Sequence, residues 1–345
     1  MIVDREQLKQ LIDQIDEPES FSGVVYLTGR EGILFEYARG FANHAEEIHN
    51  RINTRFQIAS GSKIFTSVAI CQLIERGKLE LGSQFLDYVD AEFPHYSPNI
   101  TIHHLLTHTS GITSYFEEDV NPDYESVWRD YPTYRMQTPR DFLPLFREKP
   151  MKFKPGDRFD YNDGGYILLG LVIEALSGKS FHEFVETNVL RRAGMNDSGF
   201  FRSDQLPART AVSYIRNPDG SLRSNVFAVP IIGAPDGGAY VTAADMDKFW
   251  RGLLSNQLLG EPMTSRVLAP QVETKLEPPE SFYGLGVWIN GEPNEIPSYF
   301  VTGFDPGVAF NSAYYPEQDV ILTILGNTDR ATWPVLRSLE QALKL

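Results

Sequence analysis

Apolar and polar positions alternate near both ends of the chain and follow a helical period in the middle. The first residues carry apolar side chains on one helical face, at Leu8, Leu11, Ile12 and Ile15. Two β-rich runs follow, 23–28 and 33–41, and they flank the turn sequence Gly29-Arg30-Glu31-Gly32. The N-terminal part therefore predicts a helix followed by a β-hairpin.

The C-terminal part repeats these elements in reverse order. Runs 308–315 and 320–325 flank the segment 316–319 and predict a second hairpin. A helix follows, with apolar positions at Leu336, Leu339 and Leu343. Two hairpins at opposite ends of a chain pair most simply into one antiparallel sheet that is covered by the terminal helices.

From Ser60 to about Arg192 the periodicity is helical, and 166–178 is the clearest helix, ending at a glycine. We therefore predict an α/β (α+β) fold with a large, mostly helical insertion in an antiparallel sheet. Residues 1–59 and 230–345 would form the sheet domain and 60–229 the helical domain, with an active site at their interface. The segment 117–139 is long enough to be a lid or specificity element, and equally fits a packed surface excursion.

The composition narrows the classes of function. The net charge of −15 and the lack of a Lys/Arg cluster argue against nucleic acid and against an anionic membrane surface. Cys71 is the only cysteine, so no disulfide framework exists. No signal-peptide pattern and no apolar run of about 18 residues is found, which predicts a cytoplasmic protein unless an export signal has been removed. The oligomeric state stays open.

The stretch FQIASGSKIF places Lys63 one helical turn after Ser60, where an alternating run becomes a hydrophobic helix. Residues three apart share a helical face, so the lysine can reach the serine hydroxyl. The helix dipole favours an alkoxide at this end, and burial favours a neutral amine. The pattern fits an activated nucleophile and its base. It also fits an N-cap serine and a lysine whose stem alone is buried.

Other patterns are less informative. His104 and His108 are spaced like a metal pair, and His103 is adjacent, but no HExxH glutamate or third ligand is evident. Structural histidines are the better interpretation. Neither a G-x-S-x-G elbow nor a nucleotide-binding glycine motif occurs, so we expect no α/β-hydrolase fold, no metal and no cofactor.

Five segments occur in an order that resembles the serine β-lactamase-like superfamily: FQIASGSKIFTSVAI, ITIHHLLTHTSGI, FDYNDGGYILLGLVIEALSGKSF, GGAYVTAADMDKFW and YGLGVW. The resemblance covers about 22–327 and is closest to the branch of class C β-lactamases, D,D-peptidases and esterases. It implies that Ser60 is the acylated nucleophile, Lys63 its partner, and Tyr161 the phenol that relays the proton. The backbone N–H groups of Ser60 and Phe304 would form the oxyanion hole.

Two positions depart from the family pattern. Asp163 stands where the Tyr-x-Asn motif has asparagine, and an anion there would hold Lys63 charged or accept a hydrogen bond from a substrate amine. The stretch Val301-Thr302-Gly303, followed by Phe304, lacks the basic residue that the family uses for a substrate carboxylate. With Asp305 nearby, the resemblance implies a less cationic site and a neutral or amine-bearing substrate.

The sequence thus predicts a serine hydrolase that acts on a small ester or amide through an acyl-enzyme, with esterase-like or peptidase-like activity. One alternative is an aminopeptidase or amidase selective for D-amino acids. Another is a binding protein of the same fold that has lost catalysis, for which the changes at Val301 and Asp163 are the motive.

Overall fold

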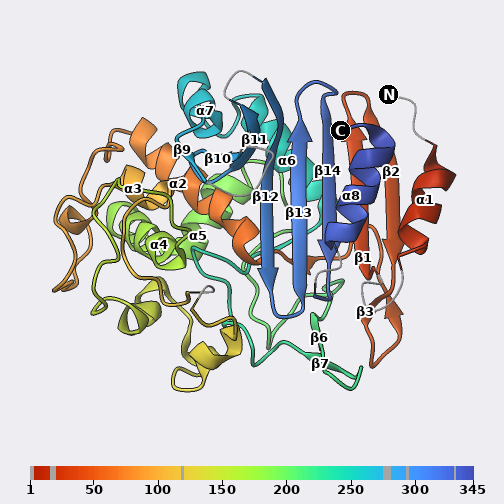
Figure 1. The fold of residues 1–345 in the computed structure, drawn as a ribbon, viewed down its shortest axis with the longest axis horizontal. Coiled ribbons are helices and arrows are strands. Elements are labelled where there is room, and N and C mark those ends of the chain that lie inside the picture. Colours follow the sequence, from red (N-terminus) through yellow and green to blue (C-terminus); the bar gives the residue numbers. More distant parts are fainter. Residues whose placement is uncertain (1–3, 16–20, 118–119, 275–280, 293–294, 330–331) are drawn as a thin grey trace.

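The fold is built on one eight-stranded antiparallel sheet (Figure 1). The computed structural model describes residues 4–15, 21–117, 120–274, 281–292, 295–329 and 332–345. In the order in which they pair, the strands are β2 (Gly32–Arg39), β1 (Gly23–Gly29), β14 (Val320–Gly326), β13 (Val308–Tyr315), β12 (Glu295–Asp305), β11 (Trp288–Glu292), β10 (Ser281–Tyr283) and β9 (Val272–Glu273). The predicted fold class is confirmed.

The two predicted hairpins meet near one edge of this sheet, where β1 lies beside β14. Strand β1 pairs with β14 along its length, from Gly23 opposite Gly326 to Thr28 opposite Ile321. The chain ends are therefore neighbours in space, as the alternating patterns at both ends predicted.

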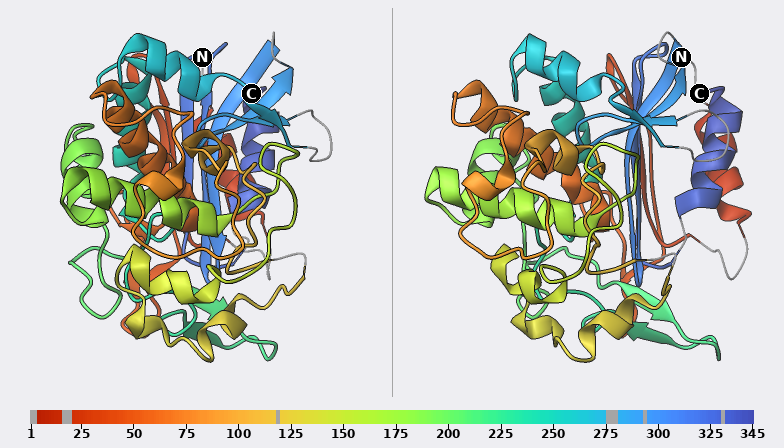
Figure 2. Two further views of the ribbon diagram at one scale, coloured as in Figure 1. Left: turned by 90° about the vertical axis from the view of Figure 1, so that its left-hand side faces the viewer. Right: turned by 60° about the vertical axis from the view of Figure 1, so that its left-hand side comes forward.

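The terminal helices α1 (Arg5–Asp13) and α8 (Thr332–Leu343) lie together on one face of the sheet (Figure 2). Asp4 caps α1, because its side chain accepts a hydrogen bond from the N–H of Gln7. Apolar residues of both helices pack on outward-facing residues of β1, β13 and β14, for example Ile12 and Leu339 with Leu322. This layer closes one side of the sheet.

The opposite face carries the remaining helices. They are α2 (Lys63–Glu75), α3 (Ile102–Leu106), α4 (Asp163–Ser177), α5 (Phe181–Val185), α6 (Ala243–Leu254) and α7 (Glu261–Leu268). Helix α2 is buried on all sides from Lys63 to Leu73, which explains why its sequence is hydrophobic all round rather than amphipathic. Helix α4 ends at Gly178, whose φ of 69° is the left-handed conformation of a C-terminal cap.

Short elements connect these layers. The small strand pairs are β3 (Phe41–Asn43) with β4 (Ile48–His49), β5 (Phe56–Gln57) with β8 (Tyr240–Val241), and β6 (Tyr214–Arg216) with β7 (Leu222–Ser224). Short stretches of 3₁₀-helix cover Ala59–Ser62, Phe85–Asp87, Tyr124–Trp128, Thr133–Arg135 and Pro139–Leu145, and a π-helical turn covers Glu186–Leu190.

One predicted strand is divided in two. The run 33–41 was expected to be continuous, but β2 ends at Arg39 and β3 begins at Phe41. Gly40 between them has a φ of 75°, and a side chain there would meet Ser22 Oγ at 2.4 Å. The chain turns at Gly40 because glycine, which has no Cβ, adopts the positive φ and avoids the clash with Ser22.

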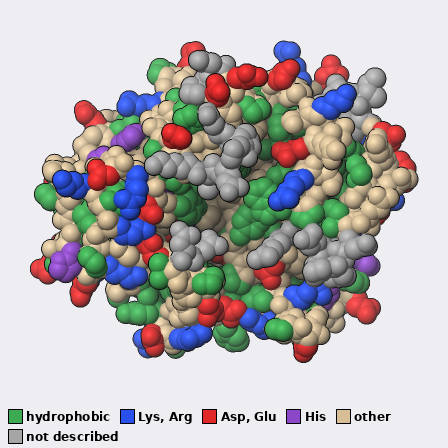
Figure 3. Space-filling model, viewed as in Figure 1, with side chains coloured by type: hydrophobic (Ala, Val, Ile, Leu, Met, Phe, Trp, Pro, Cys, Tyr) green, Lys and Arg blue, Asp and Glu red, His purple; other side chains and the backbone are tan. Residues whose placement is uncertain are grey.

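Charged side chains of both signs are dispersed over the face of the molecule seen in Figure 3. On the face in Figure 3, Lys and Arg are scattered among Asp and Glu, and the surface is hollowed near its centre. Among the described helices, none has both the length and the hydrophobicity needed to cross a membrane.

Candidate active site

Ser60 lies in a tight turn between β5 and α2. Ala59, the residue before it, has a φ of 44°, which is uncommon for a residue with a Cβ. Ser62 braces the turn, because its hydroxyl donates to the Ala59 carbonyl at 2.9 Å and accepts from the Ala239 N–H at 3.0 Å. Strained backbone of this kind is often kept where a side chain must be aimed. Here the strained residue Ala59 directly precedes Ser60, which lies in the turn that leads into α2.

Lys63 is buried below Ser60, and its side chain is only 2% exposed. Its ammonium donates three hydrogen bonds, to Ser60 Oγ at 3.0 Å, to Asp163 Oδ1 at 2.7 Å and to the Asp236 carbonyl at 2.7 Å. Burial is the largest single effect and lowers the pKa of Lys63, but Asp163, Tyr161 and Asp236 together raise the pKa above its ordinary value. The raised pKa agrees with the prediction that an anion at Asp163 holds Lys63 charged, rather than with a neutral amine.

Tyr161 lies above the same lysine, in the loop that leads into α4. Its ring centroid is 4.9 Å from Lys63 Nζ, and the side chain is 36% exposed. Burial raises the pKa of the phenol, while the charge of Lys63 and the contact with Ser60 lower it by less. The next residue, Asn162, caps α4 by accepting from the Gly165 N–H at 2.9 Å. The structure thus brings Ser60, Lys63 and Tyr161 together.

Strand β12 closes the other side of the site. A side chain at Gly303 would meet the Ile58 carbonyl at 2.2 Å and the Ser60 nitrogen at 2.8 Å, so glycine alone permits this approach. The following residue, Phe304, lines the pocket together with Ser60. Strand β12 is therefore packed directly against the backbone of the turn that carries Ser60.

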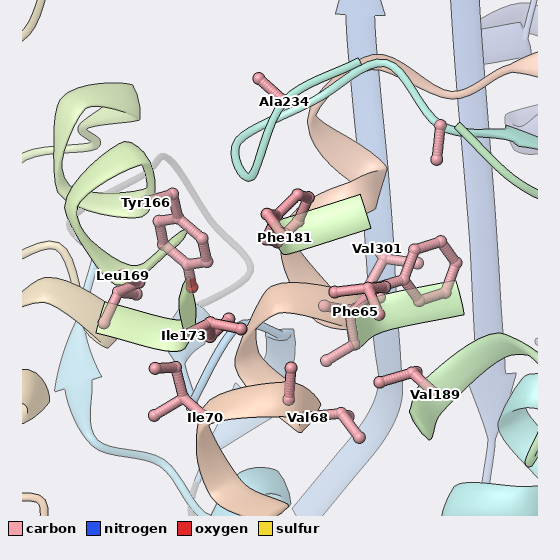
Figure 4. Packing of buried hydrophobic residues seen from close by; sticks show 14 of the residues in the cluster. Phe65, Val68, Ile70, Tyr166, Leu169, Ile173, Phe181, Val189, Ala234 and Val301 are labelled. Atoms are coloured by element: carbon pink, nitrogen blue, oxygen red, sulfur yellow. The ribbon is translucent and has the colours of Figure 1, made fainter. Parts of the chain in front are cut away.

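The other candidate residues of this strand face elsewhere. Val301 is 3% exposed and belongs to the buried hydrophobic cluster that contains Phe65 and Phe181 (Figure 4). The Thr302 hydroxyl donates to the Phe310 carbonyl at 2.8 Å. Neither residue lines the pocket. A role of Val301 or Thr302 in substrate binding stays a prediction without support from the pocket geometry.

A pocket of about 1110 Å³ opens above Ser60 and is lined by both the helical part and the sheet. Its described acidic lining residues are Glu117, Asp123, Glu125, Asp160, Asp163, Asp236, Asp305 and Asp329, and the described basic one is Arg337. Those contributed by the loops at the mouth are paired with cations, for example Glu117 with Lys152 and Glu125 with Arg223. The interior of the pocket is therefore acidic.

Sequence reasoning missed part of this interior. Asp236 is 5% exposed and accepts a hydrogen bond from the Tyr115 hydroxyl at 2.6 Å. Burial raises its pKa to about 6. Burial and the neighbouring Asp163 and Asp236 raise the pKa of Asp305 to about 8, and no hydrogen bond or ion pair among the described residues involves its carboxyl. No periodicity or motif marks Asp236 and Tyr115, which lie 121 positions apart.

The segment 117–139, proposed as a lid or a packed excursion, has features of both. Pro122, Tyr124 and Glu125 line the pocket, whereas Trp128 is 6% exposed and packs into the core. Residues 118–119 lie outside the described residues. Trp128 thus fixes the segment to the core, and the residues from Pro122 to Glu125 lie at the pocket.

The three histidines have protein partners. His103 Nε2 lies 3.2 Å from the Gln271 side chain, and His104 Nδ1 accepts from the Thr101 N–H at 3.2 Å. His108 Nδ1 accepts from the Asn162 N–H at 3.0 Å. In the part of the chain that the structure describes, no group of three or more His, Cys, Asp and Glu side chains could hold a metal ion.

The sheet backed by two terminal helices, with the helical layer on its other face, has the fold of β-lactamases and penicillin-binding proteins. The Beta-lactamase family profile matches residues 8–343, and the chain belongs to that family. A solved structure described as a penicillin binding protein from Bacillus halodurans is 47% identical. It superposes with a TM-score of 0.91 over 97% of this chain and 99% of that one.

Curated relatives agree with this assignment. Penicillin-binding protein 4* of Bacillus subtilis (strain 168) is 26% identical over 98% of this chain and 76% of its own length. Esterase EstB of Burkholderia gladioli is 30% identical over 60% of this chain and 54% of its own length. The family resemblance seen in the sequence is confirmed.

Proposed function

We propose that this protein is a serine hydrolase that cleaves a small ester or amide through an acyl-enzyme at Ser60. The observation that carries the proposal is the 3.0 Å hydrogen bond from the buried Lys63 ammonium to Ser60 Oγ, at the floor of a pocket large enough for a small molecule. Relatives named for penicillin binding and for esterase activity support acyl transfer as the reaction class.

In the proposed reaction, Ser60 Oγ attacks the substrate carbonyl and the leaving group departs with a proton. Because the Tyr161 phenol is protonated, it takes the Ser60 proton as it gives its own to the leaving group. The phenol accepts one proton while it donates another and therefore stays neutral. Its raised pKa is compatible with this role, because no phenolate has to form. The N–H groups of Ser60 and Phe304 would stabilise the tetrahedral oxyanion. Water then releases the acyl group by the reverse path.

Lys63 acts in this scheme as a fixed cation. Its hydrogen bond to Ser60 Oγ stabilises the developing alkoxide, and its charge counteracts the rise in the Tyr161 pKa. Asp163 keeps the lysine protonated and in place. This differs from the simple scheme in which a neutral lysine removes the serine proton.

A second candidate is an aminopeptidase or amidase for D-amino acid substrates, and the acidic interior of the pocket favours it. Asp236 and Asp305 line the pocket with Ser60, and the Asp305 carboxyl has no partner among the described residues. A substrate ammonium would supply the missing countercharge and would be attracted by the surrounding carboxylates. The chirality of the substrate follows from the family resemblance rather than from the pocket.

Covalent labelling tests the proposal directly. Wild type and Ser60→Ala are incubated with a fluorophosphonate and with a fluorescent penicillin, and adducts are measured by intact mass. One adduct on wild type and none on Ser60→Ala supports the proposal. Wild type that reacts with neither probe supports the non-catalytic alternative. A screen of nitrophenyl esters, D-amino acid amides and nitrocefin then identifies the substrate class.

A further inference from the structure

His108 is a fully buried side chain that contacts Tyr161 from outside the pocket. It is 1% exposed and does not line the cavity. Its ring centroid lies 4.3 Å from that of Tyr161, with 34° between the ring planes. The imidazole therefore forms part of the surface on which the phenol ring rests.

The same residue also holds the backbone on both sides of Tyr161. The Asp160 N–H donates to the His108 carbonyl at 2.8 Å, and the Asn162 N–H donates to His108 Nδ1 at 3.0 Å. Tyr161 itself precedes α4 and lies in neither a helix nor a strand. Its placement depends on such contacts rather than on a regular hydrogen-bond ladder.

The backbone of His108 is in an unusual conformation. Its φ is 56°, just after α3 ends, where glycine or asparagine is usually found. Glycine adopts this φ without steric cost, whereas histidine adopts it less freely. What histidine adds at this position is its ring and its Nδ1 acceptor.

The hydrogen bond to Nδ1 also fixes the state of the ring. Because Nδ1 accepts, the proton of the neutral ring is on Nε2, which is buried and has no hydrogen-bond partner among the described residues. Burial and the nearby Lys63 charge lower the pKa of His108 well below its usual range. The rings of Tyr166 and Tyr283 enclose it, with centroids 5.1 and 4.8 Å away. The ring is thus held neutral, which preserves its bond to the Asn162 N–H.

We propose that His108 is a positioning residue that sets the direction of the Tyr161 phenol toward Ser60. It does so through its ring contact and through the hydrogen bonds on either side of the tyrosine. This inference rests on the proposed function, since it assigns Tyr161 to the proton relay, and it adds a residue that touches neither the substrate nor the reacting atoms.

Two substitutions separate the contacts. His108→Asn tolerates the positive φ and places an amide oxygen near the position of Nδ1, but it removes the ring. His108→Gly tolerates the φ and removes both ring and acceptor. With a nitrophenyl ester, we expect kcat to fall about 100-fold in His108→Gly and about 10-fold in His108→Asn, with KM nearly unchanged. The partial recovery by asparagine is the sign of the Nδ1 hydrogen bond.

The decisive measurement repeats both substitutions in a Tyr161→Phe background. If His108 acts through the phenol hydroxyl, neither substitution lowers the residual hydrolysis by more than about twofold there. Equal losses in both backgrounds, or wild-type kcat in folded His108→Gly, would overturn the inference. Should circular dichroism show that His108→Gly does not fold, His108→Asn is judged by the same comparison.

His104→Asn is the matched control. His104 also accepts a backbone N–H through Nδ1, but its partner is Thr101 at the start of α3. We expect it to lower the melting temperature and to leave kcat unchanged. If Ser60→Ala hydrolyses the ester as fast as wild type, the proposed function fails. If Ser60 and Tyr161 are essential but His108 is not, only the present inference fails.

Discussion

The carboxylate of Asp163 lies 2.7 Å from the ammonium of Lys63, and both side chains are mostly shielded from water. Removing one partner of a buried ion pair leaves the other charge uncompensated. We therefore expect Asp163→Ala to lower the free energy of unfolding by about 3–5 kcal/mol. Asp163→Asn, which retains an acceptor oxygen, is expected to cost less. Urea denaturation of both variants checks the order, and equal stability of Asp163→Ala and wild type would contradict it.

We expect the same pair to set the pH dependence of the proposed activity. Against the lowering effect of burial, the pKa of Lys63 is raised above its ordinary value in the folded protein, mainly by Asp163, so the lysine stays charged over the working pH range in wild type. Asp163→Asn removes the anion that raises this pKa. If the cation is required, the alkaline limb of the kcat profile moves to lower pH in the variant. A limb that stays in place would show that the charge of Lys63 does not limit turnover.

Ser60→Ala should abolish hydrolysis while preserving the fold. Loss of a nucleophile costs on the order of a thousandfold or more in kcat. Ser62→Ala is the matched control, because Ser62 braces the turn with two hydrogen bonds but does not line the pocket. It should lower the melting temperature and retain labelling at Ser60. Near-wild-type turnover by purified Ser60→Ala would refute the assignment.

Lys63→Ala and Tyr161→Phe should each severely reduce acylation. Because both belong to one relay, the double variant should be little slower than the slower single variant. The rate of fluorophosphonate labelling, followed by intact mass, measures acylation without deacylation. Fully additive losses would indicate that the two side chains act separately.

Asp305 should make stability fall as pH rises. Its pKa is about 8 in the folded protein, well above an ordinary aspartate, so its contribution is present below about pH 4 and is lost as pH rises toward 8. Asp305→Asn removes this loss. We expect the variant to match wild type near pH 4 and to be more stable by on the order of 1–3 kcal/mol at pH 8. Thermal melts at both pH values measure the difference, and a pH-independent difference would contradict the prediction.

Substrate charge should depend on the same carboxyl. An amine-bearing amide is expected to lose about 10-fold or more in kcat/KM in Asp305→Asn, because a charge-assisted contact is removed. A neutral nitrophenyl ester should be affected by less than threefold. Asp329→Asn, at another part of the pocket lining, is the control for a general loss of negative charge. Similar losses with both substrates would argue against an ammonium contact at Asp305.

The sequence predicted the elements whose signals are local. The alternating runs at 308–315 and 320–325 became β13 and β14 almost residue for residue. The proximity of Ser60 and Lys63 followed from their spacing alone. The break at Gly40 was missed because a strand-like pattern continues across it, and only the close approach of Ser22 requires the turn.

The charge state of the site depends on distant residues and was harder to predict. The apolar neighbours of Lys63 favour a neutral amine, whereas the family resemblance placed Asp163 beside it, one hundred positions away, and the hydrogen bond between them agrees with the second expectation. Val301 was chosen because a family motif places a cation there, whereas its side chain lies in the core. Asp236 and Tyr115 became visible only through their hydrogen bond across the fold.

The contact between Gly303 and the Ser60 backbone has a consequence for how such a protein can diversify. Because β12 packs directly against the turn that carries Ser60, a shift of the Phe304 backbone would also disturb that turn. The pocket walls come from different parts of the chain, the segment around Tyr124 and the start of α8 at Trp333. Substitutions there can change which molecule fits while the reacting geometry stays constant. The turn at Ser60 and the adjoining β12 would keep the proposed reaction the same, whereas substitutions around Tyr124 and Trp333 would change substrate selectivity.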